Sequence, residues 1–375
     1  MNFKESFHIS VGNQMRLNSH NFSGGPGVLP QPVLDQLQRD VQGVPEIGLS
    51  ILGISHRSVW FSDVVQEAQN HIRSLLRVGP GWHILFLQGG SSLQFNMAAM
   101  NLGCHVDSPA DFIVSGYWSN KAYESSKASC KPQIVWSGQG GGYSELPELS
   151  ALAPSKDASF FHYVSNETVE GIQFETGPKF RGVPIVCDMS SDFLTKPFDV
   201  DGFDIIYAHA QKNLGPAGVT IVLVKDEIVR AIPNGLPPVL DYRRHIQESS
   251  IYNTPPVFSI YTMTLVLRWM VERFGSLDAV RRFNVEKASL VYDALDQRSD
   301  FFKTHAKRRF RSTTNVAFDI KGADPTHFLR AASALGFTGL EGHRSLGGFR
   351  ASLYNAMTLE ATQDLASFLL SYRPA

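Results

Sequence analysis

Seven short apolar runs recur between residues 83 and 224, separated by stretches with helical or loop character. Each run is apolar at successive positions, so a strand formed by it would bury both of its faces. Strands of this kind, alternating with helices, are typical of a mostly parallel sheet flanked by helices. We therefore predict an α/β fold whose strands are HILFLQ (83–88), DFIVSG (111–116), QIVW (133–136), FFHYV (160–164), PIVCDM (184–189), DIIYAHA (204–210) and VTIVLV (219–224).

Helical spacing dominates on either side of these runs. Apolar residues recur every three or four positions over residues 33–41 and 64–76, and LQFNMAAMNL (93–102) follows a Gly-Ser turn as a further helix. After the last run, two long helices are predicted over residues 256–274 and 277–298. The helices thus supply the layers that cover the predicted sheet.

The end of the chain has its own alternating pattern. NVAFDI, THFLRAASALG, FRASLYN and LEATQDLASFLLSYR read as strand, helix, strand and helix, which predicts a second, smaller α/β domain. We predict a large domain over residues 21–275, a small domain over 276–375 and a flexible tail over 1–20. The tail lacks the apolar core of a signal peptide.

Composition excludes several classes of function. Lys plus Arg number 34 and Asp plus Glu 35, so the net charge of −1 leaves no basic excess for a nucleic-acid backbone, and no nucleic-acid partner is expected. The most apolar long stretch, YTMTLVLRWMV, is interrupted by Arg268 and is too short to span a membrane. Cys104, Cys130 and Cys187 are odd in number and form no CxxC pair, which favours neither disulfides nor a metal site and fits a cytoplasmic protein.

AHAQKNLGPAG (208–218) places Lys212 directly after an apolar strand and before a Gly-Pro turn. A desolvated lysine at a strand end is suited to Schiff-base chemistry, although an exposed turn lysine is the alternative. Asp188 closes the strand PIVCD, and open α/β sheets bind ligands at the carboxyl ends of their strands. A protonated pyridine nitrogen, as in pyridoxal phosphate, would pair with a buried Asp there, whereas helix or turn capping is the alternative.

Three further strand ends carry polar or aromatic candidates. LQGGSSLQF (87–95) places two glycines, Ser91 and Ser92 between a strand and a helix, where backbone amides can bind an anion, although many ordinary turns look alike. Trp118 follows DFIVS and could stack on a planar ring, or be an ordinary core residue. Thr168 follows FFHYV, where its hydroxyl could reach such a ring or simply belong to a turn.

Arginines in two Gly- and Ser-rich segments suggest an anionic substrate. Arg57 lies in SHRS (55–58), and Arg344 and Arg350 lie in GHRSLGGFRASLYN (342–355). Guanidinium groups bind carboxylates and phosphates bidentately. Each arginine alone has a structural alternative, but together they indicate a substrate with more than one anionic group.

Taken in order from about Asn21 to the C-terminus, these motifs resemble the phosphoserine aminotransferase family. AQKNLGPAG with YNTPP and GHRSLGGFRAS is specific to that family rather than to pyridoxal-phosphate enzymes at large. The resemblance implies a class V aminotransferase of the type I pyridoxal-phosphate fold, a homodimer with its active site at the subunit interface. The remaining segments that carry the resemblance are NFSGGPGVLP, GISHRS, LQGGSSLQFNMAAMNL, GYWSNKA, SNETVEGIQF and DMSSDFL.

For the cofactor, pyridoxal 5′-phosphate, the resemblance assigns a role to each matching position. Lys212 is similar to the lysine that forms the Schiff base, Asp188 to the partner of the pyridine nitrogen, and Trp118 to the residue that stacks on the ring. Thr168 resembles the residue that bonds the ring hydroxyl. The residues that match phosphate contacts are Ser91, Ser92 and Gln211, with Asn253 and Thr254 from the neighbouring subunit.

For the substrate, the resemblance assigns Arg350 to the α-carboxylate. The group that holds the far-end phosphate or carboxylate would comprise His56, Arg57 and, from the neighbouring subunit, His343 and Arg344. Three features depart from the family: Gly53 stands where many members carry Glu, Gly24 replaces a common Ala, and the Ser91-Ser92 pair differs from the Gly, Ala or Arg found in relatives. Gly53 raises a question about how the loop carrying Arg57 is held.

The implied reaction transfers the amino group of L-glutamate to 3-phosphohydroxypyruvate, giving O-phospho-L-serine and 2-oxoglutarate in L-serine biosynthesis. A related role on 4-phosphohydroxy-L-threonine in pyridoxine biosynthesis, or on another phosphorylated or small keto acid, stays open. A cysteine desulfurase is disfavoured because Trp118 stands at the stacking position and no cysteine lies in a Gly/Ser-rich loop. A catalytically inactive cofactor-binding protein is disfavoured because Lys212 and Arg350 are both present.

Overall fold

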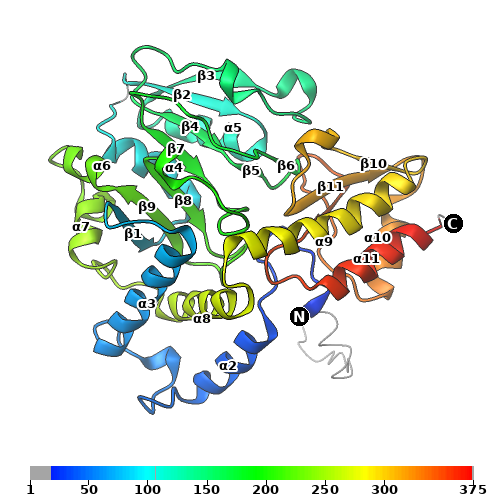
Figure 1. The fold of residues 1–375 in the computed structure, drawn as a ribbon, viewed down its shortest axis with the longest axis horizontal. Helices are drawn as coiled ribbons and strands as arrows, with labels where there is room; N and C mark the ends of the chain where they lie inside the picture. The colour runs from blue at the N-terminus through cyan, green and yellow to red at the C-terminus, as the bar shows by residue number, and fades with distance from the viewer. Residues whose placement is uncertain (1–17, 106, 374–375) are drawn as a thin grey trace, which may run out of the picture.

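The computed structural model describes residues 18–105 and 107–373, and it is organised around a seven-stranded sheet (Figure 1). Each of the seven predicted runs forms one strand, in the order β1-β9-β8-β7-β4-β2-β3. Neighbours from β3 to β8 are parallel, and β9 is antiparallel to both β8 and β1, so the predicted mostly parallel sheet is confirmed. The strands are β1 (Trp82–Leu87), β2 (Pro109–Val114), β3 (Lys131–Ser137), β4 (Phe161–Val164), β7 (Ile185–Asp188), β8 (Ile205–His209) and β9 (Thr220–Lys225).

Helices cover both faces of this sheet. One face packs against α2 (Gln31–Gln42), α3 (Val59–Leu76) and α8 (Val257–Phe274) in a single core cluster. The other face packs against α4 (Gly90–Asn101) and α5 (Tyr117–Ser126) in a second cluster. Successive strand residues alternate between the two clusters, since side chains along a strand point to opposite faces. In the described part of the chain, no helix combines the length and apolar character needed to cross a membrane.

Helix α3 shows how local sequence sets these layers. Its first turn is capped by Ser58, whose side chain accepts a hydrogen bond from the Phe61 amide. Apolar residues recur on one side from Phe61 to Leu76 and are buried against the sheet. Arg77 ends the helix in the left-handed conformation, with φ 55°.

The C-terminal part forms a separate sheet of three antiparallel strands. β10 (Phe302–Thr304), β11 (Asn315–Ile320) and β12 (Phe349–Ser352) lie in that order, flanked by α10 (Pro325–Ala334) and α11 (Leu359–Ser371). Four of these five elements match the predicted strand-helix-strand-helix pattern. β10 was missed because three residues are too few to show a periodic pattern.

Helix α9 (Leu277–Gln297) crosses from one core to the other (Figure 1). Its Leu277 and Val280 pack in the core of the large sheet, whereas Ala288 and Val291 pack in the core of the small sheet. The small core also includes Phe22, whose amide donates to the Thr338 carbonyl at 2.8 Å. The domain boundary near residue 275 stays a prediction, and residues 1–17 of the predicted tail lie outside the described residues.

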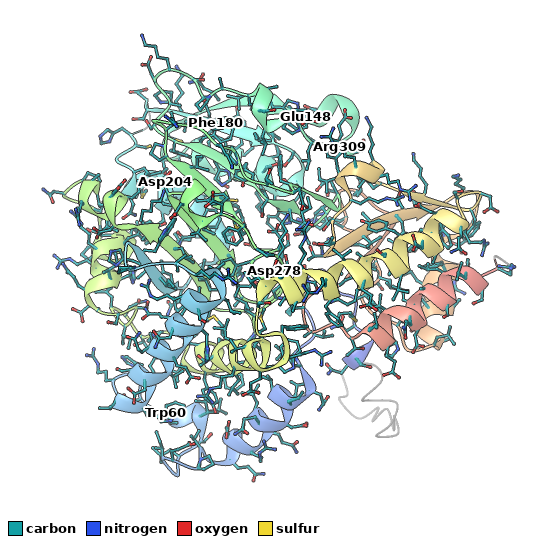
Figure 2. The ribbon with its side chains drawn as sticks, in the orientation of Figure 1. Trp60, Glu148, Phe180, Asp204, Asp278 and Arg309 are labelled. Carbon is teal, nitrogen blue, oxygen red and sulfur yellow. The ribbon has the colours of Figure 1, made fainter. Side chains whose placement is uncertain are left out.

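The two parts also meet at the outer surface, where Figure 2 labels Glu148 and Arg309. These side chains form an ion pair at 2.5 Å, but both are more than half exposed. An exposed pair of this kind contributes at most about 1 kcal/mol. The relative placement of the two parts therefore depends mainly on buried contacts, which include those of α9 and the hydrogen bonds from Asn166 to Thr314 and Asn315.

Candidate active site

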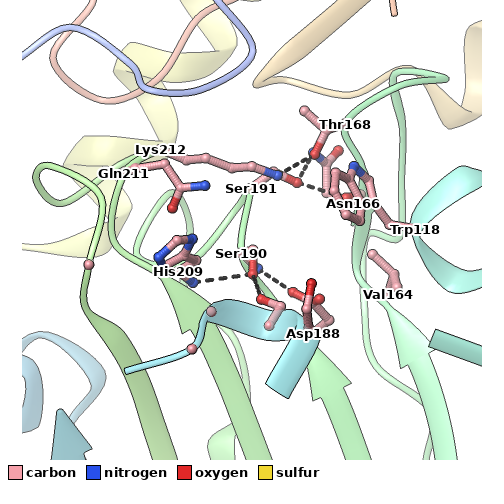
Figure 3. A pocket seen from close by; sticks show the side chains of 15 residues that line it. Trp118, Val164, Asn166, Thr168, Asp188, Ser190, Ser191, His209, Gln211 and Lys212 are labelled. Carbon is pink, nitrogen blue, oxygen red and sulfur yellow. Dashed lines mark hydrogen bonds between the residues drawn. The ribbon is translucent and has the colours of Figure 1, made fainter. Parts of the chain in front are cut away.

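A cavity of about 370 Å³ opens at the carboxyl ends of β4, β7 and β8, beside the first turn of α4 (Figure 3). This is the sheet edge at which parallel α/β folds bind ligands. Seven of the residues singled out from the sequence line it: Ser91, Ser92, Trp118, Thr168, Asp188, Gln211 and Lys212.

Lys212 is held rigidly inside this cavity. The turn after β8 is closed by the Leu214 and Gly215 amides, which both donate to the Ala210 carbonyl at 2.9 Å. The side chain is only 8% exposed, and its Nζ donates to the Thr168 hydroxyl at 2.6 Å. Figure 3 shows the side chain reaching across the cavity toward Thr168.

Burial also changes the acidity of Lys212. Desolvation is the main reason that its pKa falls to about 8; the nearby Arg350 also lowers this pKa, whereas the negative charge of Asp188 acts in the opposite direction. A substantial share of the amine is therefore neutral near physiological pH. A neutral, buried and oriented amine is a nucleophile and a proton acceptor.

Asp188 ends β7, and its carboxyl group is 3% exposed. Its Oδ1 accepts a hydrogen bond from the Ser190 amide at 2.8 Å. Burial raises the pKa of this carboxyl group, whereas the Ser190 hydrogen bonds and the charge of Lys212 lower it. The carboxylate is thus the negative group available to a cationic ring nitrogen in the cavity.

The first turn of α4 provides an anion cradle. Gly89 and Gly90 have φ of 92° and 66°, in the left-handed region that favours glycine, and they direct the chain into the helix. The unpaired backbone amides of the first turn face outward from the helix N-terminus. Ser91 Oγ lies 2.6 Å from Ser190 Oγ, which also accepts the His209 amide at 3.2 Å.

Trp118 owes its position to two buried glutamates that sequence reasoning missed. Glu167 accepts hydrogen bonds from the amides of Trp118 and Ser119, each at 2.9 Å, and Glu170 accepts one from Tyr117, also at 2.9 Å. The two carboxyl groups thus cap the N-terminus of α5. Burial raises the pKa of both, and the neighbouring Glu167 raises the pKa of Glu170 further. These groups fix the start of the helix and, with it, the indole at the cavity wall.

Arg350 lies on β12 and reaches from the small sheet toward the cavity. Its Nη1 is 3.4 Å from the Thr168 carbonyl, and its Nε is buried without a partner among the described residues. Gly24 packs directly against it, since a Cβ there would lie 2.1 Å from Arg350 Nη2. The glycine that departs from the family pattern therefore gives room to this guanidinium group.

Six predicted site residues lie outside the cavity of a single chain. Asn253 and Thr254 are exposed and contact Gln88, and His343 packs on the Tyr117 ring with 4.5 Å between ring centroids. Arg57 and Arg344 are exposed, and His56 lines a separate surface groove that it shares with Thr254.

The loop before His56 leaves space at Gly53. A Cβ at this position meets no atom within 4 Å, so a larger side chain would fit without a clash. The departure from the family at Gly53 therefore reflects no steric requirement within one chain.

Four further polar residues also line the cavity, and the sequence did not single them out: Asn166, Ser190, Ser191 and His209. All of them lie at or just after a strand end, which is the one signal that could have found them. Their types are common in turns, so position alone did not distinguish them.

Comparisons with known proteins identify the family of the chain. Residues 19–365 match the family described as aminotransferase class-V. The phosphoserine aminotransferase of Geobacillus kaustophilus is 43% identical over 362 residues, covering 95% of this chain and 98% of the relative.

Solved structures extend the likeness to three dimensions. The phosphoserine aminotransferase of Bacillus circulans subsp. alkalophilus has a TM-score of 0.88 at 40% identity, covering 93% of this chain and 97% of that one. The enzyme of Trichomonas vaginalis, solved with bound PLP, has a TM-score of 0.84 at 31% identity, with 93% and 99% covered. The matched family and the fold are those of a class V aminotransferase. Within that class, the chain belongs to the phosphoserine aminotransferase family.

Proposed function

We propose that this protein is a pyridoxal-phosphate-dependent phosphoserine transaminase of L-serine biosynthesis. It would transfer the amino group of L-glutamate to 3-phosphohydroxypyruvate, giving O-phospho-L-serine and 2-oxoglutarate. The observation that carries the proposal is the buried Lys212 amine, which shares one cavity with the carboxyl group of Asp188. Full-length identity of about 40% to phosphoserine aminotransferases supports the choice of substrate.

The residues of the cavity fit pyridoxal phosphate. The first turn of α4 offers backbone amides to the phosphate, and Asp188 offers a carboxylate to the ring nitrogen. The Gln211 side chain lines the cavity, and no described residue accepts a hydrogen bond from its Nε2, so this group can donate to the phosphate. Trp118 would face the ring, and Thr168 its hydroxyl. When bound, the cofactor supplies an electron sink for charge that develops at the substrate Cα.

The chain's own groups divide the remaining work. Lys212 Nζ would bind the cofactor and would then move a proton between the substrate Cα and the C4′ carbon of the cofactor. Arg350 would hold the α-carboxylate and fix the orientation of the Cα–H bond. Thr168 lies between the two, because it accepts from Lys212 through its hydroxyl and from Arg350 through its carbonyl oxygen.

We further propose a homodimer in which each subunit completes the site of the other. Asn253, Thr254 and Arg344 would come from the neighbouring subunit, which is consistent with their exposure in a single chain. Leu52 and Val59, which flank the SHRS segment, are 67% and 80% exposed, and apolar side chains this exposed are typical of an interface.

Mixed dimers test this arrangement. We expect a heterodimer of a Lys212→Ala subunit and an Arg344→Ala subunit to contain one intact site, because the functional Lys212 and Arg344 then meet across the interface. Its activity on O-phospho-L-serine should be about half that of the wild-type dimer, well above either mutant homodimer. Activity no greater than the average of the two homodimers would contradict the shared site.

The low pKa of Lys212 predicts how cofactor capture depends on pH. Only the neutral amine attacks an aldehyde, so the rate at which cofactor-free protein acquires its visible absorption band should rise with pH and level off above about pH 8. With an ordinary lysine, whose pKa is 10.5, the rate of cofactor capture would continue to rise well above pH 8. A stopped-flow series across this range distinguishes the two outcomes.

The substrate is tested by comparing keto acids with glutamate as the donor. We expect 3-phosphohydroxypyruvate to be aminated with a far higher kcat/KM than glyoxylate, and 2-oxoglutarate to form in equal amount. A preference for glyoxylate, or for the keto acid related to 4-phosphohydroxy-L-threonine, would contradict the proposed substrate and identify that keto acid as the preferred one. We also propose that the protein acts in the cytoplasm, which is consistent with its three buried free cysteines.

A further inference from the structure

His209 is the last residue of β8, and its imidazole lines the same cavity as Lys212. Figure 3 shows the ring beside Ser190 and Gln211. Its backbone amide is bound to Ser190 Oγ, but no described residue donates a hydrogen bond to either ring nitrogen or accepts one from it. The cavity thus contains an imidazole whose polar atoms have no protein partner.

The ring lies beside the anion cradle. A Cβ on Gly90, the first residue of α4, would lie 3.7 Å from His209 Nδ1 and 3.9 Å from Nε2. The imidazole is therefore close to the helix turn whose amides are free, with no side chain of Gly90 between them. An anion bound at that turn would lie within reach of both the amides and the imidazole.

We propose that His209 is a further ligand of the cofactor phosphate, donating a hydrogen bond to it from the imidazolium form. This inference rests on the proposed function, because it requires pyridoxal phosphate as the cofactor. It adds a titratable group to a phosphate site otherwise made of backbone amides, hydroxyls and the Gln211 amide.

The surroundings of His209 make its protonation depend on the ligand. Without an anion, burial and the positive charge of Lys212 lower the pKa of His209 to about 4, so the ring is neutral. Across the cavity, β7 contributes the carboxylate of Asp188, and the first turn of α4 contributes only Gly90 and uncharged serines. A phosphate dianion at the cradle would favour the imidazolium and raise this pKa.

The sign of the pH dependence follows from this shift. A group whose pKa is higher in the complex than in the free protein takes up a proton on binding, and it strengthens binding at pH values below the pKa of the complex. The contribution of His209 to cofactor affinity should therefore be present at mildly acidic pH and lost as the pH rises.

The test compares two ligands that differ only in the phosphate. We expect His209→Ala to weaken the binding of pyridoxal phosphate about tenfold at about pH 6, with a smaller loss at about pH 8.5, and to leave pyridoxal binding unchanged. His209→Gln, which keeps polarity without charge, should show the same pH dependence as the alanine variant. His83→Ala is a matched control, because His83 lies at the start of β1, at the end of the strand away from the cavity, where it is bonded to Asp226.

A second measurement reads the ring directly. In cofactor-free protein, NMR titration of labelled histidine should give a low pKa for His209, and pyridoxal phosphate should raise that pKa whereas pyridoxal should not. Equal loss of affinity for both ligands in His209→Ala, or a His209 pKa unmoved by pyridoxal phosphate, would overturn the proposal. If wild-type protein bound no pyridoxal phosphate at all, the proposed function itself would fail, and that outcome is read before any variant is compared.

Discussion

Lys212→Ala should lower kcat for amino transfer by at least about a thousandfold, because the variant loses both the amine that binds the cofactor and the group that moves the Cα proton. The fold should be retained, since Lys212 makes a single side-chain hydrogen bond, to Thr168, and its removal relieves a buried amine of its desolvation cost. Steady-state kinetics and thermal unfolding of the same preparation measure both effects.

Lys225→Ala is the matched control for Lys212→Ala. Lys225 is the last residue of the adjacent strand β9. Its Nζ donates to Asp204 at 3.2 Å, away from the cavity. We expect this variant to keep the wild-type kcat. Appreciable turnover by Lys212→Ala, at a rate near that of Lys225→Ala, would remove Lys212 from its assigned role.

Asp188→Asn should lower kcat by about a hundredfold and change KM by much less. Asparagine is nearly the same shape, and its Oδ1 can still accept the Ser190 amide, so the structure should persist. What is lost is the negative charge that would keep a ring nitrogen protonated and so favour charge development at the reacting carbon. Separate measurement of kcat and KM for O-phospho-L-serine tests this split.

Asp192→Asn controls for the loss of any buried carboxylate. Asp192 is 5% exposed but accepts hydrogen bonds from Ser165 and Gln173 instead of lining the cavity. We expect its main effect on thermal stability, with kcat within a few-fold of wild type. If Asp188→Asn lost no more kcat than Asp192→Asn, the pairing of Asp188 with the cofactor would be contradicted.

The sequence predicted the large sheet because strands buried on both faces leave continuous apolar runs. All seven runs became strands, but the run QIVW (133–136) lies in the edge strand β3, which has no buried residue, so the prediction that it is buried on both faces was wrong. Nothing in a run such as VTIVLV shows its direction, and β9 proved antiparallel to its neighbours. The strand β10 was invisible because it is three residues long. Phe22, near the start of the described chain, packs in the small core with residues from the C-terminal part. A contact between residues so far apart in sequence leaves no local pattern.

The site was predictable where chemistry requires an uncommon residue at a strand end. Lys212, Asp188 and Trp118 met that condition and share one cavity. Glu167 and Glu170 did not, because SNETVEG looks like a polar turn until α5 packs its N-terminus on the two carboxylates. Their role depends on a tertiary contact, which short-range sequence patterns do not encode.

A second group of residues depended mainly on the family resemblance. His56, His343, Asn253 and Thr254 were assigned by it alone, whereas the sequence also indicated Arg57 and Arg344 as anion-binding candidates. None of them lines the cavity in one chain, so no packing argument from a single subunit places them there. Their assignment stays a prediction that the mixed-dimer experiment addresses.

The most direct test of the account is the visible absorption spectrum of the purified, cofactor-loaded protein before and after addition of O-phospho-L-serine without any keto acid. We predict that the visible band disappears, because the amino group passes to the cofactor, and that 2-oxoglutarate restores it. A band unmoved by O-phospho-L-serine but bleached by another amino acid would contradict the proposed substrate. A protein that acquires no visible band with pyridoxal phosphate would contradict the assignment as a whole.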